Sequence, residues 1–154
     1  MRSVTLVTKG KAWCETVKGE YKHSVDAKGR LAMPAKLRDE LGERFTVTKG
    51  LDGCLAVYPE KEWEGLEARI RALPMSKSRD LQRFFFSAAF DAELDAQGRI
   101  LLPANLRAYA GLVKEAIIIG ASNHAEIWDA AKWTAYNDTI TDDRIMEAME
   151  DLGF

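Results

Sequence analysis

The sequence DAKGRLAMPAKLR at residues 26–38 returns almost unchanged as DAQGRILLPANLR at residues 95–107. The similarity extends well beyond these two stretches. An offset of 69 positions, from 26 to 95, fits the first part of each copy, and one inserted residue then changes the offset to 70, which aligns Trp63 with Trp133. A repeat unit of about half the chain is too long for a solenoid and is typical of two copies of one supersecondary module.

Each copy opens with a pattern that predicts a β-hairpin. Apolar and polar residues alternate from Tyr21 to Val25 and again from Leu31 to Met33, on either side of the turn sequence Asp-Ala-Lys-Gly. Gly29 completes this turn, because glycine adopts positive φ without a steric penalty. The second copy repeats the alternation around Asp-Ala-Gln-Gly. We therefore expect one hairpin at the start of each copy.

A short helix and two more strands follow each hairpin. Pro34 and Pro103 suit the first position of a helix, and Gly42 and Gly111 act as stop signals after the last apolar residues. A pair of strands and a further helix are expected next, with Asp129 as a candidate N-cap in the second copy. The expected ranges are 45–59 and 116–128 for the strand pairs, and 59–74, 78–90 and 129–138 for the helices.

The repeat divides the chain into parts. We expect the first module over residues 18–73, a linker over residues 74–77 and the second module over residues 78–136. Residues 1–17 are then an N-terminal extension of unknown role, and residues 137–154 form an acidic tail.

Charge is distributed unevenly along the chain. The 154 residues carry a formal net charge of −2, but residues 134–154 hold six acids and one base, a sum of −5, which leaves +3 for the rest. The body of this net acidic chain is therefore mildly basic, and the net charge does not exclude a polyanionic partner.

The composition indicates a protein of the cytoplasm. A chain of this length buries enough core to fold without disulfides or a metal. Cys14 and Cys54 stand in unlike sequence contexts, which favours two reduced thiols. The first residues do not resemble a signal peptide, and no apolar run approaches the roughly 20 residues of a membrane span, so we expect no membrane partner.

Patterns typical of catalytic or metal sites are not evident in the sequence. The two histidines lack a cluster of further His or Cys residues, so we expect no metal, no cofactor and no small-molecule substrate. The paired Asp-x-x-Gly turns superficially resemble a duplicated aspartic protease. In those enzymes two carboxylates share a proton, whereas Arg30 and Arg99 would keep Asp26 and Asp95 ionised. We therefore expect a protein without enzymatic activity.

The whole ordered series of motifs resembles one known family. Two DxxxR turns, each followed by a Pro-initiated helix that ends in LR, are separated by RFFFSAA, and IIG and EIW follow the second. Over residues 18–136 this series is similar to the MraZ family of bacterial transcriptional regulators, which resembles the AbrB and MazE group. The resemblance implies a mainly β fold with short helices, built as two tandem double-split β-barrel modules of the swapped-hairpin type.

The same resemblance implies a function. Members of the MraZ family bind short direct repeats in double-stranded DNA upstream of the division and cell-wall gene cluster, and they control their own operon. They assemble as rings of identical subunits, so we expect a ring-shaped homo-oligomer, an octamer, that is associated with the nucleoid.

The resemblance also implies the residues that contact DNA, because the DNA-binding motif of the family is the DxxxR turn. The matching positions are Asp26, Lys28, Arg30, Asp95, Gln97 and Arg99. Arginine presents two parallel donors that fit guanine or phosphate, and an aspartate beside it holds its side chain in one rotamer. Gln97 lacks the charge of Lys28, so we expect the second turn to attract phosphate less.

Other interpretations of these residues stay open. Aspartate before a turn and glycine within it are ordinary hairpin sequence, so the DxxxR turns can serve architecture alone. Arg38 and Arg107 are candidates for flanking phosphate contacts, although exposed helix arginines are more often solvated. The alternative function is a ring-forming protein-interaction module without specific DNA recognition, with the tail stripe Ile145, Met149 and Leu152 as its candidate surface.

Overall fold

The computed structural model describes residues 16–153 of the chain. The expected N-terminal extension, residues 1–17, lies outside the described residues except for Thr16 and Val17. Val17 exchanges two backbone hydrogen bonds with Ser122 and is 2% exposed. Val17 is therefore part of the folded core rather than of an extension.

Strands and short helices alternate along both copies. The strands are β1 (Glu20–Ser24), β2 (Arg30–Ala32), β3 (Phe45–Lys49), β4 (Leu55–Pro59), β5 (Phe90–Ala92), β6 (Arg99–Leu101), β7 (Glu115–Gly120) and β8 (Ala125–Asp129). The α-helices are α1 (Ala35–Leu41), α2 (Glu60–Arg71), α3 (Met75–Leu81), α4 (Ala104–Ala110), α5 (Ala130–Asn137) and α6 (Asp142–Glu150), and the single turns are η2 (Leu51–Gly53) and η3 (Gln82–Phe86). The expected mainly β fold with short helices, repeated twice, is confirmed.

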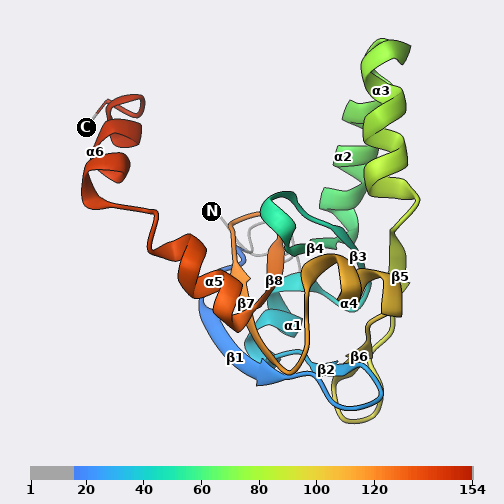
Figure 1. The fold of residues 1–154 in the computed structure, drawn as a ribbon. Coiled ribbons are helices and arrows are strands. Elements are labelled where there is room, and N and C mark those ends of the chain that lie inside the picture. The colour runs from blue at the N-terminus through green and yellow to red at the C-terminus, as the bar shows by residue number, and fades with distance from the viewer. Residues whose placement is uncertain (1–15, 154) are drawn as a thin grey trace, which may run out of the picture.

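Strands from both copies form one antiparallel sheet. Its six strands run in the order β1-β7-β8-β4-β3-β5, and β2 pairs with β6 in a separate two-stranded ladder. Each copy contributes three strands to the large sheet, and each sheet edge is a strand that lies beside the other copy (Figure 1).

The strands that open each copy pair with the opposite copy. β1 pairs with β7, with Tyr21 opposite Ile118, and β5 pairs with β3. Within the first copy, the expected hairpin is reduced to one bridge between Val25 and Leu31. The expected turn is present, but its strands are exchanged between copies, as the swapped-hairpin resemblance implied. Isolated hairpins of such short strands are marginal in water, and the exchange gives each strand a partner over a common core.

The two copies share one hydrophobic core. Leu31, Val47, Ile100, Ile118 and Ile127 come from both copies, and each is at most 1% exposed. All five belong to one continuous cluster of buried residues. Neither copy encloses its apolar residues alone, so the two modules fold as one unit.

The start and stop signals of the short helices are confirmed, whereas the helix expected over residues 78–90 begins at Met75 and ends before β5. α1 follows Pro34 and ends before Gly42, which has a φ of 86°, and α4 follows Pro103 and ends before Gly111, which has a φ of 67°. The Asp129 side chain accepts a hydrogen bond of 3.2 Å from a backbone N–H in the first turn of α5, as an N-cap does.

Residues 74–77, which we expected to form a linker, are mostly helical. Pro74 precedes α3, whose first turn contains Met75, Ser76 and Lys77. A helix forms here because proline is well tolerated at a helix start. α2 and α3 lie beside each other and project from the sheet (Figure 1). We call α2, residues 72–74 and α3 the helical arm.

The two C-terminal helices differ in their surroundings. α5 packs on β7 and β8, whereas α6 stands away from the sheet, on the side opposite the helical arm (Figure 1). Of the helices between residues 16 and 153, none combines the length and the apolar character that crossing a bilayer requires.

The β2–β6 ladder provides a matched test of the shared core. Ile100 is 1% exposed and its neighbour Leu101 is 60% exposed. We expect Ile100→Ala to lower the free energy of unfolding by about 2–5 kcal/mol, because it leaves a cavity between the copies. Leu101→Ala is expected to change it by no more than about 0.5 kcal/mol. Urea unfolding at one fixed protein concentration measures both, and equal effects would contradict a core that runs under this ladder.

Candidate nucleic-acid interface

The two DxxxR turns lie side by side at one end of the molecule. The β2–β6 ladder holds them there, with Arg30 opposite Leu101 and Ala32 opposite Arg99. In Figure 1 the loops before β2 and β6 form the bottom of the view, away from the helical arm and from α6. All six residues that the sequence predicted for DNA contact are in or next to these two loops.

The first turn is organised by one carboxylate. Asp26 Oδ1 accepts hydrogen bonds from the backbone N–H groups of Lys28 at 2.9 Å and Arg30 at 2.8 Å. Asp26 Oδ2 accepts from Arg30 Nε at 2.7 Å. The Asp26 carbonyl also accepts from Gly29 N–H, which closes the turn. One side chain therefore fixes both the loop backbone and the arginine that leaves it.

The second turn repeats this geometry. Asp95 Oδ1 accepts from the backbone N–H groups of Gln97 and Arg99, both at 2.9 Å. Asp95 Oδ2 accepts from Arg99 Nε, also at 2.9 Å. The two copies have thus kept one hydrogen-bond pattern despite the change from lysine to glutamine in the loop.

The aspartates are held in their ionised form. Backbone hydrogen bonds from Arg30 lower the pKa of Asp26 below its ordinary value, and those from Arg99 lower the pKa of Asp95, with side-chain hydrogen bonds from the same arginines adding to the effect. The lowered pKa values of both aspartates agree with the expectation that the arginines keep these carboxylates ionised.

Each arginine has free donors beyond its bond to aspartate. Only the Nε atoms of Arg30 and Arg99 donate to Asp26 and Asp95, and among the described residues no hydrogen bond uses their Nη atoms. Arg99 Nη1 also lies 3.8 Å from Asp26 Oδ2, which links the two turns electrostatically. The side chains of Arg30 and Arg99 are 33% and 27% exposed. The paired Nη donors are therefore held in place and available to an external acceptor.

The two loops differ at their exposed tips. Lys28 and Gln97 are both exposed, and they occupy equivalent positions of the two copies. The first loop thus offers an exposed positive charge where the second offers a neutral amide, as the sequence indicated.

Two further arginines support the turns, in a role that the sequence analysis missed. Arg107 on α4 lies against Gly29 of the first turn, and Arg38 on α1 lies against Gly98 of the second. A Cβ atom on Gly29 would stand 2.8 Å from Arg107 Nε, and one on Gly98 would stand 2.9 Å from Arg38 Nη1. Arg107 Nε also donates to the Leu102 carbonyl at 3.0 Å. Each helix of one copy therefore braces the turn of the other copy.

The sequence suggested that Arg38 and Arg107 are exposed to solvent, and this is wrong. Arg38 and Arg107 are both half-buried, and the Arg38 Nε atom is buried. The signal was present in the sequence, because both turns contain glycine at the point of contact and both helices carry an LR pair at equivalent positions. The contact itself depends on strand exchange, which local sequence does not reveal.

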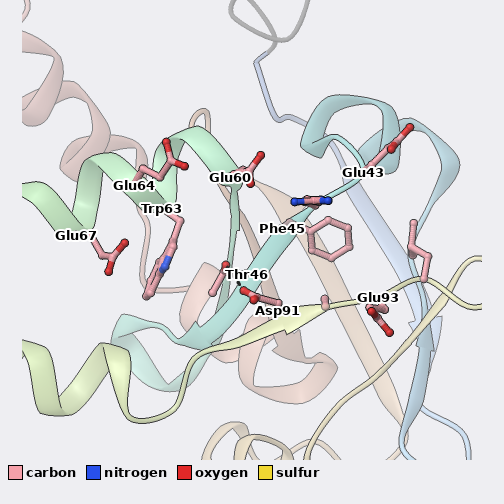
Figure 2. A pocket seen from close by; sticks show the side chains of 12 residues that line it. Glu43, Phe45, Thr46, Glu60, Trp63, Glu64, Glu67, Asp91 and Glu93 are labelled. Atoms are coloured by element: carbon pink, nitrogen blue, oxygen red, sulfur yellow. Dashed lines mark hydrogen bonds between the residues drawn. The ribbon is translucent and has the colours of Figure 1, made fainter.

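A groove elsewhere on the molecule has the opposite charge. Figure 2 shows it between α2 and the edge strand β5, with Trp63 and Phe45 among its walls. Six carboxylates line it: Glu43, Glu60, Glu64, Glu67, Asp91 and Glu93. Arg44 is the one basic lining residue within the described part of the chain. This groove repels a polyanion, and none of the six expected DNA contacts lines it.

Cys54 and His124 are further side chains of reactive types within residues 16–153. Cys54 is buried, and burial raises the pKa of its thiol to about 12, which leaves it protonated. His124 stacks on Tyr58 and lies 3.2 Å from a Glu126 oxygen through Nε2. Over residues 16–153, no group of three or more His, Cys, Asp and Glu side chains is arranged to hold a metal ion. Cys14 lies outside the described residues.

Comparison with known sequences identifies the family. The family described as "MraZ protein, putative antitoxin-like" matches the chain twice, over residues 17–84 and 85–152. The chain belongs to the MraZ family. The two matches confirm the tandem repeat, and the second one reaches residue 152, so the expectation that the resemblance ends at residue 136 is wrong. Helix α6 is part of the MraZ pattern.

Relatives with the same family name are similar in sequence to this chain over most of their length. A relative from Heliobacterium modesticaldum, named "Transcriptional regulator MraZ", is 56% identical over 122 residues, which are 78% of this chain and 85% of that protein. Relatives of the same name from Acetivibrio thermocellus and Symbiobacterium thermophilum are 51% and 53% identical. Each alignment covers 88% of this chain, and they cover 97% and 99% of the two relatives.

The brace between MraZ copies can be tested with glycine substitutions. Gly29 and Gly42 both have a φ of 86°, but a Cβ atom on Gly42 would meet nothing within 4 Å. Alanine at either position loses roughly 1 kcal/mol or more of stability because of the positive φ. We expect Gly29→Ala to cost more than Gly42→Ala, since it also displaces the Arg107 guanidinium.

The double variant Gly29→Ala/Arg107→Ala shows whether this contact is responsible. The double variant should lose less stability than the sum of the two single losses. The added Cβ atom at position 29 clashes only when the Arg107 side chain is present, so the double variant has no clash. Thermal and urea unfolding of the four proteins measure this coupling. Additive effects would mean that Arg107 does not brace the first turn.

The lowered pKa values predict a pH dependence. An aspartate with a lowered folded-state pKa adds stability above its ordinary value of 3.8, and this stability is lost as the pH falls through the lowered pKa. We expect Asp26→Asn/Asp95→Asn to be less stable than the unmodified chain at pH 7, with the difference shrinking below pH 3.8. Urea unfolding over a pH series measures the difference, and a constant gap would rule out ionised carboxylates as its source.

Proposed function

We propose that this chain, a transcriptional regulator by its family, binds double-stranded DNA sequence-specifically through the two DxxxR turns. The observation that supports the proposal best is the arrangement of Arg30 and Arg99. Each is held by its own aspartate through Nε, which leaves the Nη donors for DNA, and strand pairing places the two turns side by side.

Each residue of the first turn has a distinct role in this proposal. Arg30 reads a guanine edge or binds a phosphate with its Nη donors, and Lys28 at the exposed tip contacts the phosphate backbone. Asp26 does not touch phosphate. It preorganises Arg30, which lowers the entropy that the arginine loses on binding.

The second turn has the same role, but it attracts the DNA phosphates less strongly than the first turn does. Asp95 holds Arg99 as Asp26 holds Arg30. Gln97 reaches the backbone as a neutral hydrogen-bond donor, so its contact depends less on salt than that of Lys28. Binding at the two turns is therefore unequal in strength.

One chain presents only two such turns, so assembly strengthens binding. We include in the proposal a ring-shaped homo-oligomer, an octamer, which places many paired turns along one arc. Direct repeats in the DNA then meet several turns at once, and the effective concentration of the remaining turns rises after the first contact. The turns lie away from α6 and its carboxylates, which keeps the acidic tail clear of the phosphates (Figure 1).

The proposed targets are short direct repeats upstream of the division and cell-wall gene cluster, including the chain's own operon. The proposed location is the cytoplasm, at the nucleoid. A binding role rather than catalysis is supported by the name that the relatives share, transcriptional regulator. No membrane, cofactor, metal or small-molecule substrate enters the proposal.

The test is fluorescence anisotropy with a duplex from upstream of the chain's own gene and a scrambled duplex, over a salt series. We expect preferential, salt-sensitive binding of the upstream duplex. Arg30→Ala should weaken it by about 1–3 kcal/mol, and the preference over the scrambled duplex should fall. Lys22→Ala is the matched control, because Lys22 is an exposed base on β1, paired with Glu115 at 3.2 Å and outside the turns.

Equal affinity for both duplexes, or an effect of Lys22→Ala as large as that of Arg30→Ala, would contradict the proposal. The DxxxR turns would then be hairpin architecture, and the chain would be a ring-forming protein-interaction module. The exposed apolar residues of α6 are the observation that favours this second candidate.

A further inference from the structure

The β2–β6 ladder has one buried face and one outer face. Leu31 and Ile100 lie opposite each other on the buried face, at 0% and 1% exposure. Residues directly opposite in an antiparallel pair point to the same side, and so do residues two positions apart along one strand. The outer face therefore consists of the other four side chains of the ladder: Arg30, Ala32, Arg99 and Leu101.

Leu101 is the large apolar side chain of this outer face. It is 60% exposed, whereas Ile100 and Leu102 on either side are at most 1% exposed. A single exposed leucine is ordinary on a protein surface, so its place is more informative than its exposure. Among the large exposed hydrophobic residues of the described chain, Leu101 alone belongs to the ladder that holds the DxxxR turns.

Leu101 lies beside the arginine that the proposed function assigns to base reading. Arg30 is its direct partner across the ladder, and the Cβ atoms of such partners are roughly 5 Å apart. Arg30 Nε donates to Asp26 Oδ2 at 2.7 Å, which holds the guanidinium in place. The outer face thus presents an aliphatic side chain and a preorganised guanidinium next to each other.

The major groove of DNA displays the groups that this pair of side chains fits. The groove admits a two-stranded β-ribbon, and guanine offers two acceptors there while thymine offers its C5-methyl group. Arginine binds the guanine acceptors, and an apolar side chain packs on the thymine methyl. Neighbouring base pairs are about 3.4 Å apart, so side chains roughly 5 Å apart contact bases about one or two steps from each other.

The other half of the outer face does not reach as far. Ala32 occupies the position of the first copy that corresponds to Leu101, and it lies opposite Arg99. An alanine methyl stays close to the backbone, whereas a leucine side chain extends away from the strand. A contact with a thymine methyl is therefore expected beside Arg30 rather than beside Arg99.

We propose that Leu101 packs on a thymine C5-methyl group in the major groove, next to the base that Arg30 reads. This inference rests on the proposed function and adds a specificity-determining residue to the same interface. The outer face of the ladder enters the groove, and the exposed loop tips remain free to contact phosphates. The target then contains thymine within about one or two base pairs of the guanine bound by Arg30.

Deoxyuridine provides the test, because it lacks the C5-methyl group of thymine and keeps the same base-pairing edge. Fluorescence anisotropy measures the binding of the upstream duplex with thymine, and of the same duplex with deoxyuridine at every thymine position. The proteins are the unmodified chain, Leu101→Ala and Leu51→Ala. Leu51 is the matched control, since it is a leucine of similar exposure, 67%, that lies in η2, outside the ladder.

Burying one methyl group is worth about fourfold in affinity, so deoxyuridine should weaken binding of the unmodified chain by at least about this factor. Leu51→Ala should behave in the same way as the unmodified chain. Leu101→Ala should bind the thymine duplex at least about fourfold more weakly, and deoxyuridine should have no further effect on it. Urea unfolding and sedimentation should show that Leu101→Ala folds and assembles like the unmodified chain.

Three binding results would overturn the thymine contact: equal affinity of the unmodified chain for both duplexes, an equal loss with deoxyuridine in Leu101→Ala, or an equal loss of affinity in Leu51→Ala. Loss of assembly in Leu101→Ala would also overturn it, because Leu101 would then be a contact between subunits.

The scrambled duplex separates this inference from the proposed function. If the upstream duplex is still preferred and Arg30→Ala still weakens binding, a missing deoxyuridine effect removes the Leu101 contact alone. Equal affinity for the upstream and scrambled duplexes removes specific DNA recognition itself.

Discussion

The pairing of β2 with β6 is the interaction on which the rest of the structure depends. Leu31 and Ile100 face each other across this ladder, and both are buried in the core that the two copies share. The same pairing sets Arg30 and Arg99 at neighbouring positions and brings each helix arginine under the opposite turn. Stability and the candidate DNA interface therefore have one structural origin.

Local features such as turns and helix ends were predictable from the sequence. The strands and side chains that pair across the two copies were not. The turns, the helix starts at Pro34 and Pro103, and the N-cap at Asp129 depend on residues close together in the chain. The strand exchange and the contact of Arg107 with Gly29 join residues that are far apart in the sequence. The alternating sequence pattern of a hairpin is identical whether its strands pair within one copy or between the two copies. The helical conformation of residues 75–77 was not predicted, because a proline before a helix resembles one before a loop.

The candidate site was predictable for a related reason. Asp26 and Arg30 are four residues apart on the two sides of one turn, so their contact is local and follows from the hairpin. The family resemblance, rather than turn chemistry, suggested DNA as the ligand. The separation of acidic and basic surfaces could be recognised only from the sequence and the structure together. The sequence showed an acidic tail, and the structure shows that α6, the acidic groove and the paired turns occupy different faces.

The strand exchange makes this molecule equivalent to a swapped dimer whose two halves are tied together by the helical arm. A dimer of identical halves must present two identical loops. Because the halves share one chain, they are free to diverge, and they differ at Lys28 and Gln97. The pair of loops is consequently asymmetric, because one loop tip carries a positive charge and the other carries a neutral amide. A surface with polarity distinguishes the two directions along a DNA axis, which a symmetric pair does not.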